Sequence, residues 1–189
     1  MEYRHSKITN LKKCISNNTV QVLLGAILWV FAVWYVIHDS GGLAGYDAYF
    51  HVKMSEIIRD QRSIIKEFPW ATCSIWADSY HDKDLLFHIS LIPFLYFGKV
   101  TGAKFATLLL VFITAIVLAL MLSSAGLRNN YFLTLSFILF SGGAIFPGRL
   151  VLCRPHLLSL IFLMISLFCV FRNYRLLLMI TAYFYTLGY

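Results

Sequence analysis

The feature that most constrains this fold is Val20–Ile37, a run of 18 residues without a charged side chain near the start of the chain. As an α-helix it would be about 27 Å long, close to the roughly 30 Å hydrocarbon core of a bilayer. Over the whole chain 59% of residues are hydrophobic and 13% are charged, and the mean hydropathy is +0.72. Soluble domains contain nearer one quarter charged residues, so the composition indicates a membrane protein.

Four further apolar runs predict an all-α fold, a polytopic transmembrane helix bundle. They are Phe105–Ala125, Tyr131–Phe146, Leu157–Phe171 and Leu176–Tyr189. The predicted division is a basic tail at 1–19, a first transmembrane helix at 20–37, a long external loop at 38–104 and further transmembrane helices at 105–189. Because the last run ends without a polar flank, we expect the chain to be the N-terminal part of a longer protein.

Basic residues predict how the chain sits in the membrane. The tail before the first helix contains four cationic residues against one acid, so the N-terminus is expected in the cytoplasm and the protein in the cell membrane. A signal peptide has an apolar region of roughly 7–15 residues, so the longer run favours an uncleaved anchor. The net charge of +7 is then explained by topology and contact with anionic membrane lipids, and no nucleic-acid partner is expected.

The external loop contains an amphipathic segment. Apolar residues recur at helical spacing from Phe50 to Phe68, and charged residues stand between them. Such a helix is expected to lie along the membrane interface. Asp47 stands where an N-cap belongs, and Pro69 with Trp70 is expected to end the helix.

Leu85–Phe97 leaves two topologies open. If this thirteen-residue apolar segment spans the membrane, Arg149 and Arg154 are cytoplasmic; if it lies in the interface, they face outside together with Asp47. A count of lysines and arginines barely separates the two. Length is the better criterion, because thirteen residues that include a histidine and a proline are short for a span. We therefore favour the interfacial topology.

The first candidate site is the pair Asp47 and His51. Eight of the nine carboxylates lie between Asp39 and Asp84, beside the first membrane helix. The two residues are four positions apart and share one face of a helix. A carboxylate and an imidazole there suit a divalent metal (Mg²⁺ or Mn²⁺) or the activation of a hydroxyl or amide acceptor. Helix capping explains the aspartate equally well, although it does not explain the aromatic residues that flank it.

The second candidate site is Arg149, Arg154 and His156. Pro155 suits the first turn of a helix, so Arg154 and His156 stand at a helix N-terminus, where free N–H groups favour an anion. With a guanidinium added, this predicts a phosphate-binding site. The alternative, and the commoner fate of loop arginines, is that both anchor the loop at the lipid headgroups.

The third candidate site is a dense cluster of acids and histidines. Its members are Asp78, His81, Asp82, Asp84 and His88. They could supply further metal ligands or contact a sugar, but their spacing is not diagnostic, and solvated loop charges are the commoner explanation.

The order of these pieces resembles the N-terminal half of the GT-C glycosyltransferase superfamily, especially the catalytic subunits of oligosaccharyltransferases. In that family a first span leads to an external loop that opens with an Asp-x-Tyr-type element on an amphipathic helix. Here that element is Tyr46-Asp47-Ala48-Tyr49-Phe50-His51-Val52-Lys53. The pieces that follow match in order: Leu85–Phe97, Phe105–Ala125, Tyr131–Phe146, the Arg149–His156 loop and Leu157–Phe171.

By this resemblance Asp47 would be the catalytic, metal-associated carboxylate and Arg149 the arginine of the second external loop. Arg154 and His156 stand where the family has acidic residues. This departure favours a branch with a lipid-phosphate sugar donor and a hydroxyl acceptor over an asparagine glycosylator. The resemblance thus implies an inverting glycosyltransferase that takes a sugar from a polyprenyl-phosphate-linked donor, with the acceptor unknown. A transporter or flippase subunit, or a non-catalytic membrane scaffold, are the alternatives.

Overall fold

A computed structural model of the protein describes residues 2–70, 72–127 and 129–188. Every regular element in these ranges is a helix, so the all-α prediction is confirmed for the described residues. The elements are α1 (Glu2–Ile37), α2 (Tyr46–Gln61), the 3₁₀ helix η1 (Ile75–Ala77), α3 (Leu85–Leu91), the 3₁₀ helix η2 (Ile92–Phe97), α4 (Lys99–Ser124), α5 (Asn129–Ser141), α6 (Ile145–Leu150), α7 (His156–Arg172) and α8 (Arg175–Gly188).

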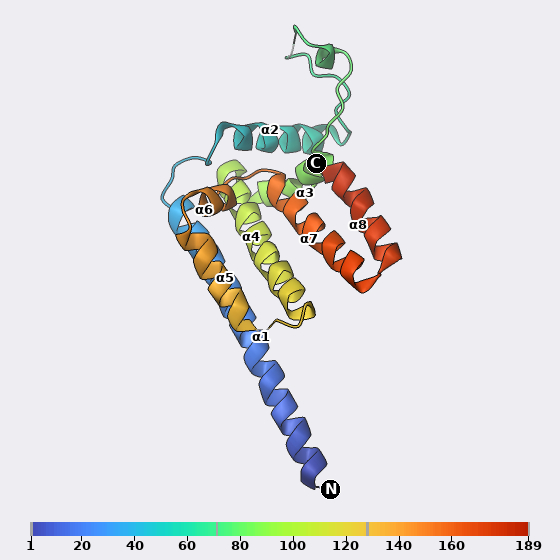
Figure 1. Cartoon of the computed structure of the whole chain (residues 1–189). Coiled ribbons are helices and arrows are strands. Elements are labelled where there is room, and N and C mark those ends of the chain that lie inside the picture. The colour runs from blue at the N-terminus through green and yellow to red at the C-terminus, as the bar shows by residue number, and fades with distance from the viewer. Residues whose placement is uncertain (1, 71, 128, 189) are drawn as a thin grey trace.

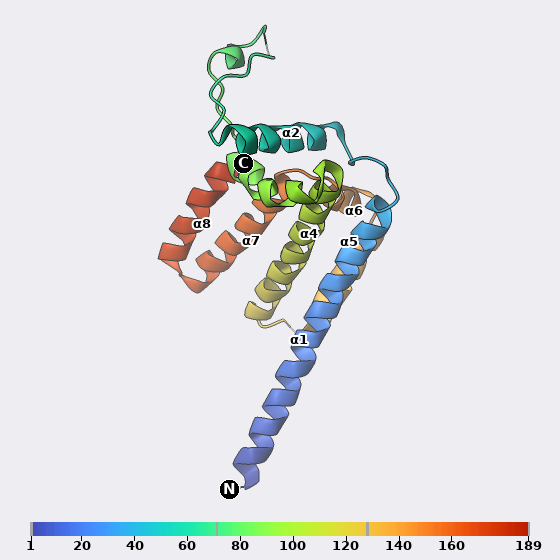
Figure 2. The same ribbon diagram turned by 180° about the vertical axis from the view of Figure 1, so that it is seen from behind.

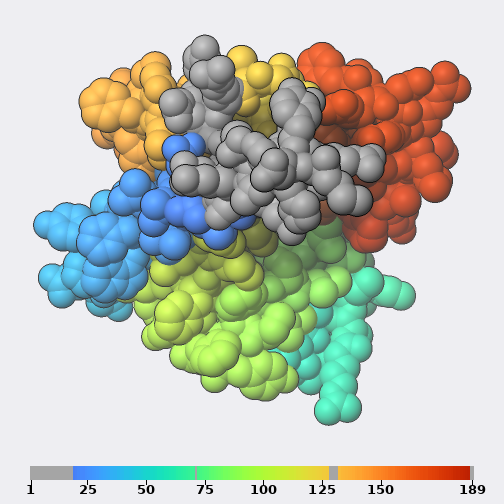
Figure 3. Space-filling model, turned by 90° about the horizontal axis from the view of Figure 1, so that it is seen from below, coloured from blue at the N-terminus to red at the C-terminus, as the bar shows by residue number. Residues whose placement is uncertain are grey.

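The long helices form a bundle that is covered at one end by shorter ones (Figure 1). α4 packs between α1 and α7, α5 lies along α1, and α8 packs on α7. α2 crosses one end of the bundle, and α3 and α6 lie at that same end, as the view from behind also shows (Figure 2). Seen from below, α1 in blue and the last helices in red lie on different sides of the molecule (Figure 3).

Two helical segments are long and apolar enough to cross a membrane, Thr19–Ile37 and Lys99–Ser124. Only 28% and 33% of their apolar windows are buried, so most of this surface faces outward, whereas a soluble core helix would be mostly buried. These helices weakly indicate a membrane protein. The other apolar helices are shorter, at 10–17 residues, and the side chains of the basic tail lie outside the described part. The polytopic bundle and its orientation therefore stay predictions.

Trp29 of α1 is the centre of the apolar core between α1 and α5. Its side chain is 2% exposed and its ring stacks on Phe132 and meets Phe140 and Phe146 edge to face. Its indole N–H donates to Ser136 Oγ at 2.9 Å, so the polar atom of the ring is satisfied inside the core. These contacts fix α5 on α1 and thereby position α6, which follows at the covered end of the bundle.

The limits of α2 differ from the prediction. The N-cap residue is Gly45, and Asp47 is the second residue of the helix and makes no capping hydrogen bond. The helix ends at Gln61, well before Pro69, because Arg62 turns the chain with a left-handed backbone (φ 51°, ψ 30°). The prediction of Asp47 as N-cap is therefore wrong, and its carboxylate is available for other contacts.

Two other apolar runs also break where glycine or proline stands. The run from Tyr131 to Phe146 divides into α5 and α6 around Gly143, whose φ of 131° favours glycine. Leu85–Phe97 divides into α3 and η2, with a proline in the first turn of the 3₁₀ helix. Both pieces lie across the end of the bundle beneath α2 (Figure 1). The interfacial topology stays a prediction.

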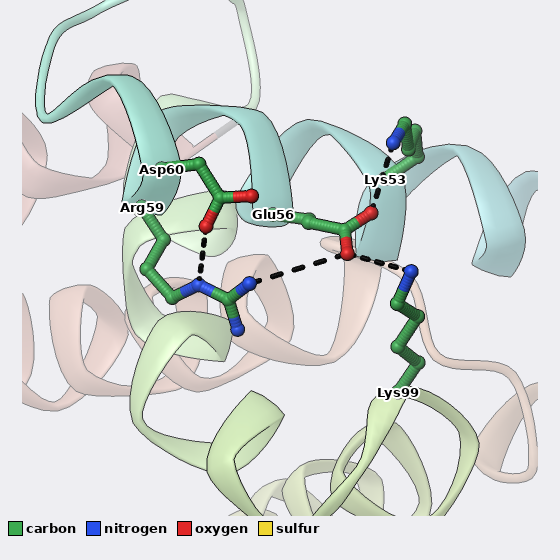
Figure 4. Close-up of polar contacts among 5 residues, drawn as sticks. All are labelled: Lys53, Glu56, Arg59, Asp60 and Lys99. Carbon is green, nitrogen blue, oxygen red and sulfur yellow. Dashed lines mark hydrogen bonds and ion pairs between the residues drawn. The ribbon is translucent and has the colours of Figure 1, made fainter.

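A network of charged side chains holds α2 on the start of α4 (Figure 4). The Glu56 carboxylate, whose side chain is 11% exposed, accepts hydrogen bonds from the ammonium groups of Lys99 (2.6 Å) and Lys53 (2.9 Å). Arg59 Nη2 lies 4.0 Å from Glu56 Oε1, the oxygen that Lys99 also contacts. The two ammonium hydrogen bonds lower the pKa of Glu56 to about 2. Since Lys99 is the first residue of α4, this network ties the helix that carries Asp47 to the bundle.

Replacing Glu56 with Gln is expected to lower the free energy of unfolding by about 1 kcal/mol, because the amide cannot attract the two ammonium groups. The folded-state pKa lies below the usual value of 4.5, so the wild type loses this contribution as the pH falls from 4.5 towards 2. Thermal unfolding in detergent at pH 7 and pH 3 measures both effects, with the exposed Asp60→Asn on the same helix as the control. If the unfolding midpoint falls by the same amount from pH 7 to pH 3 in Glu56→Gln and in the wild type, this role of Glu56 is contradicted.

Gly102 is the point of closest approach between α4 and η2. A Cβ atom built there would overlap the backbone carbonyl group of Phe94. We expect Gly102→Ala to lower the free energy of unfolding by about 1–3 kcal/mol, because backbone atoms must move apart. Gly41→Ala is the control, since nothing lies within 4 Å of its Cβ position. Equal unfolding midpoints for the two variants in urea would show that η2 does not pack on α4 in this way.

Candidate functional site

A cavity of about 300 Å³ opens beneath the N-terminal half of α2, at the covered end of the bundle. Residues from all three predicted clusters line it, although they lie as much as a hundred positions apart in the sequence. The lining residues are Asp47, Phe50, His51, Lys83, Asp84, Arg149, Arg154, Pro155 and His156. The structure therefore brings the first two candidate sites together and adds one acid of the third.

An ion pair links the first two clusters. Arg154 Nη2 lies 2.9 Å from Asp47 Oδ2, and the two side chains are 29% and 60% exposed. The carboxylate that does not cap α2 is thus held by the arginine that precedes α7. This pairing places Asp47 and Arg154 at the same end of the bundle, as the interfacial topology requires. It also means that Arg154 already has an anionic partner, which the sequence did not indicate.

Arg154 has one hydrogen-bond donor that the ion pair with Asp47 does not use. Its Nε is buried, and among the described residues it has no hydrogen-bond partner. A buried, unpartnered donor on a charged group is costly, so the position favours a ligand that brings an acceptor. Arg154 and His156 flank Pro155, the N-cap residue of α7, so the predicted location at a helix start is confirmed.

His156 is oriented by the loop that precedes it. Its Nε2 lies 2.8 Å from the backbone carbonyl oxygen of Arg149, so this nitrogen carries the proton and donates. In the neutral ring Nδ1 is then an acceptor, and it is buried without a partner among the described residues. His156 therefore presents an acceptor to a ligand hydroxyl, and it can help to bind a phosphate only when protonated.

The acid–histidine cluster divides into two parts. Asp82 Oδ2 lies 2.6 Å from His88 Nδ1, and His88 Nε2 lies 2.9 Å from His51 Nδ1, so these three buried side chains form one chain of hydrogen bonds. Asp84 is buried beside the cavity; burial raises its pKa, and its Oδ1 has no described partner.

Asp78 and His81 lie elsewhere. Both are exposed, on the segment that projects beyond α2, and they line a separate, open cavity of about 570 Å³. Asp82 also lines this second cavity, so it lies between the two parts of the cluster. For the exposed Asp78 and His81, solvated loop charges remain the simpler explanation.

The predicted Mg²⁺ or Mn²⁺ site rests on Asp47 and His51. In the described part of the chain, no group of three His, Cys, Asp or Glu side chains is placed to hold a metal ion. One oxygen of Asp47 is paired with Arg154, and one ring nitrogen of His51 is paired with His88. The metal stays a prediction, and no step below depends on it.

Two lining residues were not predicted from the sequence, Lys83 and Phe50. Lys83 lies between two of the candidate acids, and that position was the only signal for it. Phe50 lines the cavity and places its ring edge to face against His51 and His88.

No protein-family model, curated protein or solved structure matches this chain.

Proposed function

We propose that this chain belongs to a membrane glycosyltransferase of the GT-C type, which moves a sugar from a polyprenyl-phosphate-linked donor to a hydroxyl acceptor on the non-cytoplasmic face. The observation that carries the proposal is the shared cavity, in which Asp47 and His51 face Arg149, Arg154 and His156. A transferase needs both groups at one place: a proton acceptor for the attacking hydroxyl and cations for the departing phosphate.

The phosphate side of the cavity is formed by three cationic residues. Lys83, Arg149 and Arg154 line it, against the two carboxylates of Asp47 and Asp84. The unpartnered Nε of Arg154 would donate to a phosphate oxygen, and the other two would add positive charge. As the bond between the sugar and the phosphate breaks, its electron pair leaves with the phosphate, and fixed cations stabilise the added negative charge.

Residues of the cavity also provide two acceptors for a sugar. His156 Nδ1 and Asp84 Oδ1 are both buried and unpartnered among the described residues. Sugar hydroxyl groups are donors that would satisfy both. A ligand that carries both phosphate oxygens and hydroxyl groups therefore satisfies more of these atoms than a simple anion does.

A transporter is supported less well. The buried hydroxyl groups of α4, on Thr107 and Thr114, donate to carbonyl oxygens of their own helix, so these donors are already used within α4. Among the described residues, all three buried side-chain atoms without a hydrogen-bond partner belong to residues that line the cavity at one end of the bundle. A site at the end of the helices suits chemistry on a lipid headgroup.

The test is a transfer assay with the full-length protein in proteoliposomes that contain a polyprenyl-phosphate-linked radioactive sugar. We expect label to move from lipid to a water-soluble hydroxyl acceptor and polyprenyl phosphate to accumulate in equal amount. If the label instead stays on the lipid and only changes leaflet, the protein is a flippase and the proposal is wrong.

A further inference from the structure

Three buried side chains form a continuous chain of hydrogen bonds that ends at the cavity. Asp82 precedes α3, His88 lies within α3, and His51 lies in α2. The side chains of Asp82 and His88 are 2% and 0% exposed, and His51 is 5% exposed. Of the three, His51 is the one that lines the cavity with Asp47 and Arg154.

The Asp82 carboxylate determines which atoms donate and which accept in this series of hydrogen bonds. One oxygen of its carboxylate accepts the backbone N–H of Asp84 at 3.1 Å, and the other lies 2.6 Å from His88 Nδ1. A carboxylate only accepts, so His88 Nδ1 carries a proton and donates it. In a neutral ring His88 Nε2 is then an acceptor, and His51 Nδ1 must donate to it. The remaining nitrogen of His51, Nε2, is left with a free lone pair.

The surroundings keep the ring of His51 neutral. Phe87 lies edge to face against His51 at 5.3 Å between ring centroids, and Phe50 packs against both histidines. Burial first, and then the neighbouring His88, lowers the pKa of His51 to about 4. The opposite direction would turn the lone pair of His88 Nδ1 towards the Asp82 carboxylate, an unfavourable contact in a buried position.

We propose that Asp82 and His88 are positioning residues that hold His51 in the tautomer whose Nε2 accepts the proton of the attacking hydroxyl. The hydroxyl oxygen forms the new bond to the sugar carbon, its proton moves to His51 Nε2, and the old carbon–oxygen bond breaks with its electron pair on the phosphate. The imidazolium formed is stabilised through His88 and the Asp82 charge. This inference rests on the proposed function, and it assigns the proton to His51 in preference to Asp47.

Asp47 is less suited to that task in this structure. One of its oxygens is paired with Arg154, and its side chain is 60% exposed. Its charge nevertheless favours a proton on His51, since it acts to raise the pKa of that imidazole. Asp47 thus supports the proton transfer by its charge and by holding Arg154.

The first test is ¹⁵N NMR of the full-length protein with labelled histidine, with the signals of His51 assigned by comparison with His51→Gln. At neutral pH we expect a proton on Nδ1 and none on Nε2, whereas a proton on Nε2 in the wild type would overturn the inference. An Asn at position 82 can turn a donor towards His88, so Asp82→Asn is expected to shift the tautomer of His51.

The second test is kinetic. We expect Asp82→Asn to lower kcat for sugar transfer by at least about 100-fold with KM for the donor lipid unchanged. Asp78→Asn is the matched control, since it changes an exposed carboxylate four residues from Asp82 that takes no part in these hydrogen bonds. Unchanged kcat and tautomer in Asp82→Asn overturn the inference while the proposed function stands. A wild type without transfer activity refutes the proposed function, and the proton assignment falls with it.

Discussion

Asp47→Asn is expected to reduce sugar transfer by at least about 100-fold while leaving the helices intact. The carboxylate lies at the cavity, its charge favours a proton on His51, and it holds Arg154 at 2.9 Å. An amide keeps the shape of the side chain but loses the charge on which both the effect on His51 and the pairing with Arg154 depend. Stability should change little, because ion pairs at exposed side chains contribute at most about 1 kcal/mol.

The measurement is kcat for transfer by the purified full-length variant, together with its circular dichroism spectrum and unfolding midpoint. Asp60→Asn is the matched control, since it removes an exposed carboxylate from the same helix, remote from the cavity. Turnover at the parental rate in Asp47→Asn would reduce Asp47 to a surface partner of Arg154.

Arg154→Lys is expected to raise KM for the donor lipid about tenfold, and Arg154→Ala by more. The guanidinium can pair with Asp47 through Nη2 and still donate from the buried Nε, whereas a lysine ammonium offers only one charged centre. Arg149→Ala should have a milder effect. The rise in KM for His156→Ala should lie between those of Arg149→Ala and Arg154→Ala, because the His156 ring contributes through Nδ1 and also donates to the Arg149 carbonyl.

The control for Arg154 is Arg62→Lys, at the C-terminal end of α2 and outside the cavity lining. If KM in Arg154→Ala equals that of the wild type, Arg154 only anchors its loop at the lipid headgroups, which is the alternative given in the sequence analysis.

Local patterns predicted the parts of this site that depend on local geometry. Asp47 and His51 share one face of α2 because they are four residues apart, and Arg154 precedes α7 because Pro155 suits a helix start. The helical class followed in the same way from long uncharged runs. Each of these inferences needs only the period of a helix or the missing N–H of proline.

Contacts between distant segments could not be read from the sequence. The ion pair of Asp47 with Arg154 and the bond of His51 to His88 join residues that are 107 and 37 positions apart. No local rule gives such pairings, since they depend on how α2 lies across the bundle. The capping role assigned to Asp47 failed for the same reason: its carboxylate reaches Arg154 and leaves the backbone of α2 uncapped.

The segment Leu85–Phe97 is a case in which the apolar pattern alone did not predict the structure. Its apolar run suits a short span or an interfacial helix equally well. The structure divides it into α3 and η2 beneath α2, where His88 is fully buried against His51. A histidine in an apolar run was the signal that this segment contributes to a site.

The central claim is that the residues of α2 and the Arg149–His156 loop form one site for the phosphate of a lipid donor. The most direct measurement is a binding titration of the full-length protein in nanodiscs with polyprenyl phosphate and, separately, with polyprenol of the same chain length. We predict that the phosphate binds at least about tenfold more tightly than the alcohol, and that Arg154→Ala removes most of this difference. Equal affinity for the two lipids in the wild type would contradict the account.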